Sequence, residues 1–145
     1  MLGLTLSAAK ASFFDREKVK NAIDADTRKV LSKFGAYVRQ RAKTSIRKRR
    51  GISRPGMPPH SHVGLLRKLI LFAFDEGRRS VVIGPVLLRP GSQVPSLLEY
   101  GGETTIFHAK SKRRRKARYR ARPYMRPAFE AELKNLPDIW KRSIR

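Results

Sequence analysis

The chain contains no cysteine, so neither a disulfide framework nor a cysteine-based metal site can form. It also lacks any apolar run that approaches the roughly 20 residues of a membrane span. The apolar start at residues 1–9 has no basic beginning and is too short for a secretory signal. We therefore expect a soluble protein that is made in a reducing cytoplasm and makes no contact with a membrane.

The chain also has few acidic residues. The 145 residues include 11 Asp and Glu against 34 Lys and Arg, which gives a net charge of +23. Neither Asp nor Glu occurs in residues 27–74 or 104–129, and these two stretches hold most of the basic residues. Charge of one sign repels itself in a compact fold unless it faces a polyanion. The pattern favours contact with nucleic-acid phosphates, with a solvated basic surface or a disordered basic loop as the alternative.

Patterns of catalytic residues are missing as well. The chain has no Gly-x-Ser-x-Gly elbow and no glycine loop that would cradle a phosphate. His60 and His62 form a His-Ser-His pair, but no acid lies near them in sequence to complete a metal site. We predict no enzyme activity, no cofactor and no metal, and we interpret the two histidines as polar loop residues. A nuclease built from Glu99, Glu103 and a lysine is the catalytic alternative.

The length predicts a single domain over residues 1–145, with 1–11 as an N-terminal tail. Ser12 and Asp15 have the spacing of a capping box. Apolar residues at helical spacing then predict one long amphipathic helix from about Phe14 to about Arg49. These residues are Val19, Ile23, Val30, Phe34, Val38 and Ala42. Gly35 within this helix predicts close packing or a kink.

The remaining segments are shorter. Residues 63–71 predict a short second helix or the start of a strand, and residues 71–74 and 80–83 predict a β-hairpin around the turn at 75–78. Further expected segments are an extended stretch at 86–88, a strand or short helix at 96–100, and a strand at 104–107. A closing helix over about 127–144 should break near Asn135 because Pro137 follows, and Phe129 and Trp140 should be its core residues.

This order of elements predicts an α+β fold: a long N-terminal helix, a short second helix, an antiparallel sheet of about four strands, and a C-terminal helix packed on the sheet. Nine of the thirteen residues from Lys110 to Arg122 are cationic, without the apolar alternation of a strand. We predict that residues 110–122 form a basic flexible loop.

Two basic groups are the candidate DNA contacts. No helix-turn-helix, zinc-finger or RNA-recognition pattern accompanies them, so we expect contact with phosphates that does not depend on base sequence. The candidates are Arg47, Lys48, Arg49, Arg50, Lys112, Arg113, Arg114, Arg115, Lys116, Arg118, Arg120 and Arg122.

Three further runs follow one another along the chain. Residues 55–68 read Pro-Gly-Met-Pro-Pro-His-Ser-His-Val-Gly-Leu-Leu-Arg-Lys, residues 97–102 read Leu-Leu-Glu-Tyr-Gly-Gly, and residues 122–131 read Arg-Pro-Tyr-Met-Arg-Pro-Ala-Phe-Glu-Ala. Gly101 and Gly102 suit a sharp turn, and Pro127 suits the first turn of a helix.

In this order the three runs resemble the tail-component family of long-tailed bacteriophages, the small neck or tail-completion proteins related to the minor tail protein Z of lambdoid phages. That family shows a Pro-Gly-x-Pro-Pro loop, a Thr-Gly-x-Leu-Arg-like helix start, a Glu-aromatic-Gly turn and an Arg-Pro-aromatic-x-Arg-Pro-Ala helix start. Here Val63 stands where threonine is usual, Lys68 where a small polar residue often follows, and a basic insert separates the last two motifs. The resemblance covers about residues 20–140.

The resemblance implies a structural role for the motif residues. They are Pro55, Gly56, Pro58, Pro59, Gly64, Leu65, Glu99, Tyr100, Gly101, Arg122, Pro123, Arg126 and Pro127. Glu99 is expected either to pair with an arginine of a neighbouring subunit or to be a surface acid paired within its own chain.

The resemblance also implies a place in the virion. The protein would form a ring at the head–tail junction, hexameric, between the head-closure or connector protein and the tail terminator or tail-tube protein, around double-stranded DNA. It would be assembled in the host cytoplasm. The alternative is a stand-alone, non-specific nucleic-acid-binding protein associated with ribosomes or the nucleoid, which the charge alone would allow.

Overall fold

The computed structural model describes residues 16–86, 93–108 and 112–143. The predicted tail at 1–11, the capping box at 12–15, residues 87–88 of the extended stretch and Lys110 lie outside these residues. The α+β class is confirmed, with helices at both ends and the strands between them.

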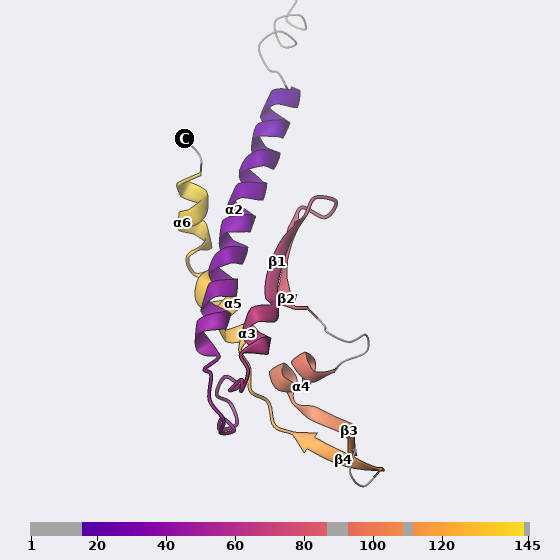
Figure 1. Ribbon diagram of the computed structural model, residues 1–145. Coiled ribbons are helices and arrows are strands. Elements are labelled where there is room, and N and C mark those ends of the chain that lie inside the picture. Colours follow the sequence, from indigo (N-terminus) through magenta and orange to yellow (C-terminus); the bar gives the residue numbers. More distant parts are fainter. Residues whose placement is uncertain (1–15, 87–92, 109–111, 144–145) are drawn as a thin grey trace, which may run out of the picture.

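Helix α2 (Arg16–Ser45) is the longest element, and the loop that follows it and the strands β3 and β4 lie beyond its C-terminal end (Figure 1). Val30, Phe34, Val38 and Ala42 are buried, so the predicted apolar face is confirmed over the C-terminal half of the helix. Val19 and Ile23 are exposed, because the N-terminal part of α2 extends beyond the elements that cover the rest. The helix ends at Ser45 and not near Arg49.

Residues 46–50 leave the helix because the chain here is held by other partners. Ile46 turns into the core, where only 1% of it is exposed, and Arg47 pairs with His60 in an isolated parallel bridge. The prediction of a helix that includes Arg47, Lys48 and Arg49 is therefore wrong.

Helix α3 (Leu65–Leu69) leads directly into strand β1 (Ile70–Asp75), which pairs with β2 (Ser80–Pro85) as predicted. The antiparallel register places Phe72 opposite Ile83 and Phe74 opposite Val81. This hairpin lies against α2. Two ion pairs join its turn to the helix, Arg28–Glu76 at 2.7 Å and Arg79–Asp24 at 3.1 Å.

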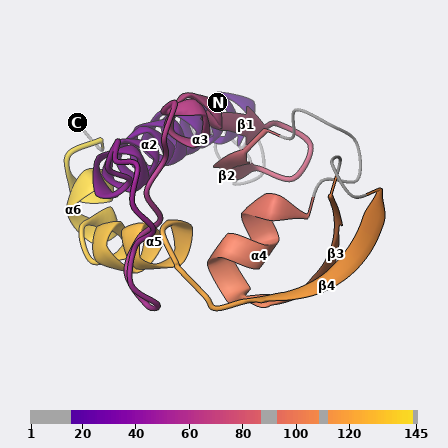
Figure 2. The same cartoon turned by 60° about the horizontal axis from the view of Figure 1, so that its bottom comes forward.

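A second unit follows, formed by helix α4 (Val94–Tyr100) and strands β3 (Gly102–His108) and β4 (Arg113–Tyr119). Figure 2 shows α4 between the body of the molecule and the β3–β4 sheet, which we call the arm. The four strands thus form two separate two-stranded sheets and not the single sheet that was predicted.

The predicted flexible loop at 110–122 is wrong for residues 113–119, which form strand β4 and pair with β3 along its whole length. Backbone hydrogen bonds define this pairing, and they do not require apolar side chains. The alternation of apolar and polar residues that usually marks a strand is absent from β4, because its side chains are exposed except for Ala117 and Tyr119, which are partly buried.

The chain closes with α5 (Met125–Leu133) and α6 (Leu136–Lys141), so the predicted break near Asn135 is confirmed. Both helices pack mainly along α2, which separates them from the β1–β2 hairpin (Figure 1). Phe129 is 42% exposed and touches Phe34 edge-on, with ring centroids 5.6 Å apart. It lies at the margin of the core and not within it as predicted, and Trp140 is partly buried.

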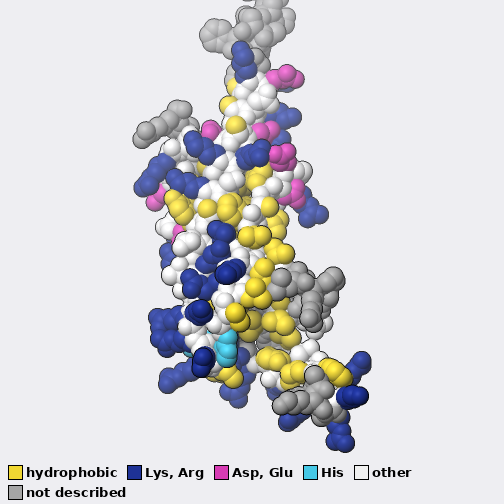
Figure 3. All heavy atoms as spheres, in the orientation of Figure 1, with side chains coloured by type: hydrophobic (Ala, Val, Ile, Leu, Met, Phe, Trp, Pro, Cys, Tyr) yellow, Lys and Arg dark blue, Asp and Glu magenta, His cyan; other side chains and the backbone are white. Residues whose placement is uncertain are grey.

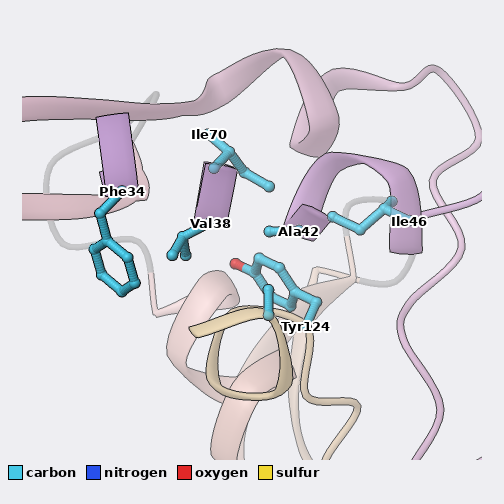
Figure 4. Packing of buried hydrophobic residues seen from close by; sticks show 7 residues of the cluster. Phe34, Val38, Ala42, Ile46, Ile70 and Tyr124 are labelled. Carbon is cyan, nitrogen blue, oxygen red and sulfur yellow. The ribbon is translucent and has the colours of Figure 1, made fainter. Parts of the chain in front are cut away.

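The core gathers around Tyr124, which is 1% exposed. Figure 4 shows its ring among side chains of α2 and β1. The buried cluster consists of Phe34, Val38, Ala42, Ile46, Ile70, Tyr124 and Ala128.

Gly35 faces the β1–β2 hairpin at close range. A Cβ built on it would lie 2.7 Å from Val81 Cγ2 and 2.9 Å from Phe72 Cδ2. The predicted close packing is confirmed.

We expect Gly35→Ala to lower the free energy of unfolding by about 1–2 kcal/mol, because overpacking outweighs the better helix propensity of alanine. Urea denaturation measures this. Gly51→Ala, where no atom lies within 4 Å of the added Cβ, is the control and should change little; an equal effect in both variants would contradict the packing argument.

Glu132 joins α5 to α2. Its carboxylate accepts hydrogen bonds from Arg41 Nε and Asn135 Nδ2, and the residue is 7% exposed. The bond from Arg41, opposed by burial and aided by Asn135, lowers the pKa of Glu132 below its ordinary value. A lowered folded-state pKa means that the stabilisation is fully present above the ordinary pKa and is lost as the pH falls through the folded-state value.

We therefore expect wild type to be more stable than Glu132→Gln at pH 6, and the difference to shrink by pH 3. Urea titrations of both proteins at the two pH values measure the difference in unfolding free energy, and the other carboxylates cancel between them. A difference that stays constant with pH would show that Glu132 does not act through its charge.

Candidate nucleic-acid interface

Strand β4 presents five exposed cations on two faces of the arm. Successive side chains of a strand point to opposite faces, so Arg113 and Arg115 share a face with Ala117 and Tyr119, towards α4. Arg114, Lys116 and Arg118 project from the other face. Both faces of the arm therefore carry positive charge.

The partner strand offers little acid to balance it. Register places Arg114 opposite Phe107, Lys116 opposite Thr105, and Arg118 opposite Glu103. Within the described part of the chain, none of the five β4 cations forms an ion pair. Their charge is available to an external anion.

The second predicted group, Arg47 to Arg50, lies in the loop after α2, and all four residues are exposed. The His-Ser-His pair holds this loop: His60 Nδ1 lies 2.9 Å from the Gly51 carbonyl oxygen, and His62 Nε2 bonds the Arg50 carbonyl oxygen. The Ser61 amide donates to the Arg47 carbonyl at 3.0 Å. The histidines thus bond the backbone of the basic loop. Among the residues that the structure describes, no three His, Asp or Glu side chains come together to hold a metal.

The remaining predicted DNA contacts, Lys112, Arg120 and Arg122, differ in their exposure. Lys112 and Arg120 flank β4 and are exposed, and Lys112 has a positive φ of 49° at the end of the arm. Arg122 is partly buried: its Nε donates to the Ser53 carbonyl at 3.1 Å and its guanidinium also donates to the Arg120 carbonyl at 3.2 Å. Arg122 is therefore a structural residue of this fold, as the motif implied, and its guanidinium is already engaged within the chain.

The two exposed groups lie at one end of the molecule but on different segments. Figure 3 shows Lys and Arg side chains over the whole face, mixed with Asp and Glu in the upper part and without visible acids at the lower end, over the loop after α2 on the left and the arm on the right. The structure brings the two groups to the same end without merging them into one patch.

The position of the arm depends on Glu99, the last but one residue of α4. Its carboxylate accepts backbone hydrogen bonds from Tyr124 at 3.0 Å, Met125 at 3.0 Å and Arg126 at 2.7 Å, and the residue is 9% exposed. These amides open α5 and have no acceptor within their own helix. A carboxylate also suits the positive end of a helix. Glu99 is paired within its own chain, as one of the two predictions had it, but it is buried and not a surface acid, and its partners are backbone amides.

The sequence held a signal for this cap. Tyr124 stands at the N-cap of α5 and makes no side-chain capping bond, whereas Ser, Thr, Asp or Asn usually fills that position. A helix that starts without its own cap needs an acceptor from elsewhere in the chain. Burial, and to a smaller extent the nearby Glu99, also raises the pKa of Tyr124.

The three motif runs meet around residues 119–126, which we call the junction. The Arg122 amide donates to the Leu98 carbonyl at 2.6 Å, and the Gly56 amide donates to the Ala121 carbonyl at 2.9 Å. Gly101 has a φ of 75°, and a Cβ there would lie 3.0 Å from both Tyr119 O and Ala121 N. Proline loop, glycine turn and closing-helix start are thus bonded to one another.

The other motif residues have lesser roles. Gly64 precedes α3 with a φ of 74°, and Pro127 lies in the first turn of α5. Arg126 pairs with Glu130 at 2.9 Å. Pro59 and Pro123 are at least partly buried, while Pro55, Leu65 and Tyr100 are exposed and Pro58 is partly so.

No family model matches this chain, and neither a curated protein nor a solved structure is significantly similar to it. In the described ranges, none of the helices combines the length and the apolar character that crossing a membrane requires.

Removal of the Glu99 carboxylate should strongly destabilise the junction. We expect Glu99→Ala to lower the free energy of unfolding by about 2–4 kcal/mol, because three amides at the start of α5 lose their acceptor. Glu99→Gln keeps one acceptor oxygen and should cost less. Glu103→Ala, an exposed acid on β3, is the matched control. Guanidinium denaturation measures all three, and equal losses for Glu99→Ala and Glu103→Ala would refute the capping role.

Proposed function

We propose that this protein is a structural subunit of the head–tail junction of a long-tailed phage. In this role it forms a hexameric neck or tail-completion ring between the head-closure protein and the tail terminator, and it contacts the DNA in the channel without reading its sequence. The protein is a virion component and not an enzyme. The resemblance of the three ordered motifs supports the place in the virion, and the unpaired cations support the DNA contact.

The observation that carries the proposal is the junction. The motifs are far apart in sequence, yet Leu98, Glu99 and Gly56 all bond directly to residues of the junction. Residues that form one hydrogen-bonded unit explain why the motifs occur as an ordered set. This supports the interpretation that the set specifies a shared architecture in place of a catalytic site.

Ring formation requires two different surfaces on each subunit that close by rotation. The first helix and the proline loop are our candidates, and both carry exposed apolar side chains. Ile23 of α2 is 57% exposed, and in the proline loop Ile52 is 85% and Met57 58% exposed. Apolar side chains of this size favour burial against a neighbour.

Quantitative mass spectrometry of purified, DNA-filled particles tests the proposal. A neck ring predicts about half as many copies of this protein as of the twelve-fold portal protein that the resemblance implies. Absence from mature particles, together with abundance in infected cells, would overturn it in favour of an assembly factor or a free nucleic-acid-binding protein.

The DNA contact can be tested separately in particles. We expect replacement of Arg113, Arg114 and Arg115 by alanine to reduce DNA retention in filled particles while the ring still assembles, because three exposed cations at the end of the arm no longer hold phosphates. Replacement of Arg78, Lys134 and Arg142 by alanine removes the same charge from exposed sites outside α2 and the proline loop and is the control. Encapsidated DNA is measured by quantitative PCR after nuclease treatment. Normal retention in the arm variant would refute a role of the arm in holding DNA.

A stand-alone nucleic-acid-binding protein is the second candidate, and the exposure of the β4 cations on a single subunit favours it. Filter binding of duplex DNA at rising salt separates the two. A dedicated binder should bind tightly at physiological salt with a steep salt dependence. A neck subunit should bind weakly alone, since its charges act together only in the closed ring.

A further inference from the structure

A cleft of about 350 Å³ opens at the C-terminal part of α2, the loop after it, and α3. Its lining comes from all three segments: Lys43, Lys48, Val63, Gly64, Arg67 and Lys68. Only Lys48 belongs to the basic groups considered above, so the cleft is a different site from the arm.

Four of the six lining residues are cations, and none is an acid. Within the described ranges, none of these four cations forms an ion pair. Their charges also come from separate segments, which sets the cleft apart from a solvated helix face where lysines point away from one another. The fold thus brings like charges together around a hollow.

Lys43 is partly buried and lies near further cations. Partial burial, followed by the charges of Arg39 and Arg67, lowers the pKa of Lys43 below its ordinary value. Arg39 cannot easily move away, because its Nε donates to the Ile70 carbonyl at 2.9 Å. An anion in the cleft would relieve this repulsion, since opposite charge nearby favours the protonated lysine.

We propose that the cleft lined by Lys43, Lys48, Arg67 and Lys68 is a phosphate-binding site. A phosphate group offers several charged oxygens to cations that approach from different directions. Lysine meets such a group as a point charge, and arginine meets it through paired donors. The phosphate belongs either to a nucleic-acid strand, in which case the cleft adds to the DNA contact of the proposed function, or to a small phosphorylated compound.

Isothermal titration calorimetry with tripolyphosphate at low ionic strength tests the site on the full chain. We expect Arg67→Ala/Lys68→Ala to weaken binding by about ten-fold or more, because half of the cleft cations are removed. Lys20→Ala/Lys29→Ala removes the same charge from exposed sites of α2 and should weaken it by about two-fold at most. No binding by wild type, or equal losses in the two variants, would overturn the proposal.

A charge-retaining variant tests whether binding is lost because charge is removed or because the local structure is disturbed. Arg67→Lys/Lys68→Arg keeps both positive charges and should bind tripolyphosphate within about three-fold of wild type. Circular dichroism checks that each variant is folded. If this variant loses binding as severely as Arg67→Ala/Lys68→Ala, the side chains serve structure and the site is refuted.

A short DNA duplex distinguishes the two sources of phosphate. If the cleft holds backbone phosphates, the cleft variant should show a less steep dependence of log K on log salt than the control, by about 0.9 for each DNA phosphate that the variant no longer neutralises. If tripolyphosphate binding falls and DNA binding does not, the ligand is a small phosphorylated compound. Either result is independent of whether the protein is found in virions, so failure of the neck assignment would leave the cleft standing.

Discussion

The carboxylate of Glu99 is the contact on which the arrangement of the two halves depends. It lies at the end of α4, the helix that carries the arm, and it accepts the first amides of α5, the helix that packs on α2. Other contacts also link these halves: the Leu98 carbonyl accepts from the Arg122 amide, the Ala121 carbonyl accepts from the Gly56 amide of the proline loop, and Leu98 packs against the buried core. Glu99 therefore contributes to the direction in which the cations of β4 face.

The positions of the few acidic residues also explain where positive charge is left unbalanced. Asp24 and Glu76 anchor the hairpin turn, Glu132 anchors α5, and Glu99 caps it. Each of these acids stabilises a link between elements of the fold, which leaves the arm, the loop at 47–50 and the cleft at α3 with little balancing charge. Excess cations thus collect at the places that the internal contacts do not reach, which are also the places open to a ligand.

How much the sequence could predict depended on the kind of contact involved. Val30, Phe34 and Val38 showed the buried face of α2, and Pro137 marked the break before α6, because periodicity and proline geometry are local properties. Strand β4 was missed since its pairing with β3 rests on the backbone and most of its side chains face solvent. Glu99 was misjudged because its partners are amides 25 residues away, which no side-chain pattern records. The cleft could not be predicted from the sequence, because Lys43 and Arg67 come together only in the folded chain.

The arm has a thermodynamic consequence of its own. A sheet of two strands is marginally stable in water, and the like charges along β4 oppose its folding further. A polyanion that binds the folded arm stabilises it by mass action. If the arm binds a polyanion as proposed, its stability and the occupancy of that ligand are therefore linked: β4 is least stable without the polyanion and more stable when the polyanion is bound. Slow amide exchange in β3 and β4 would then report the ligand, while exchange in α2 would report only the body.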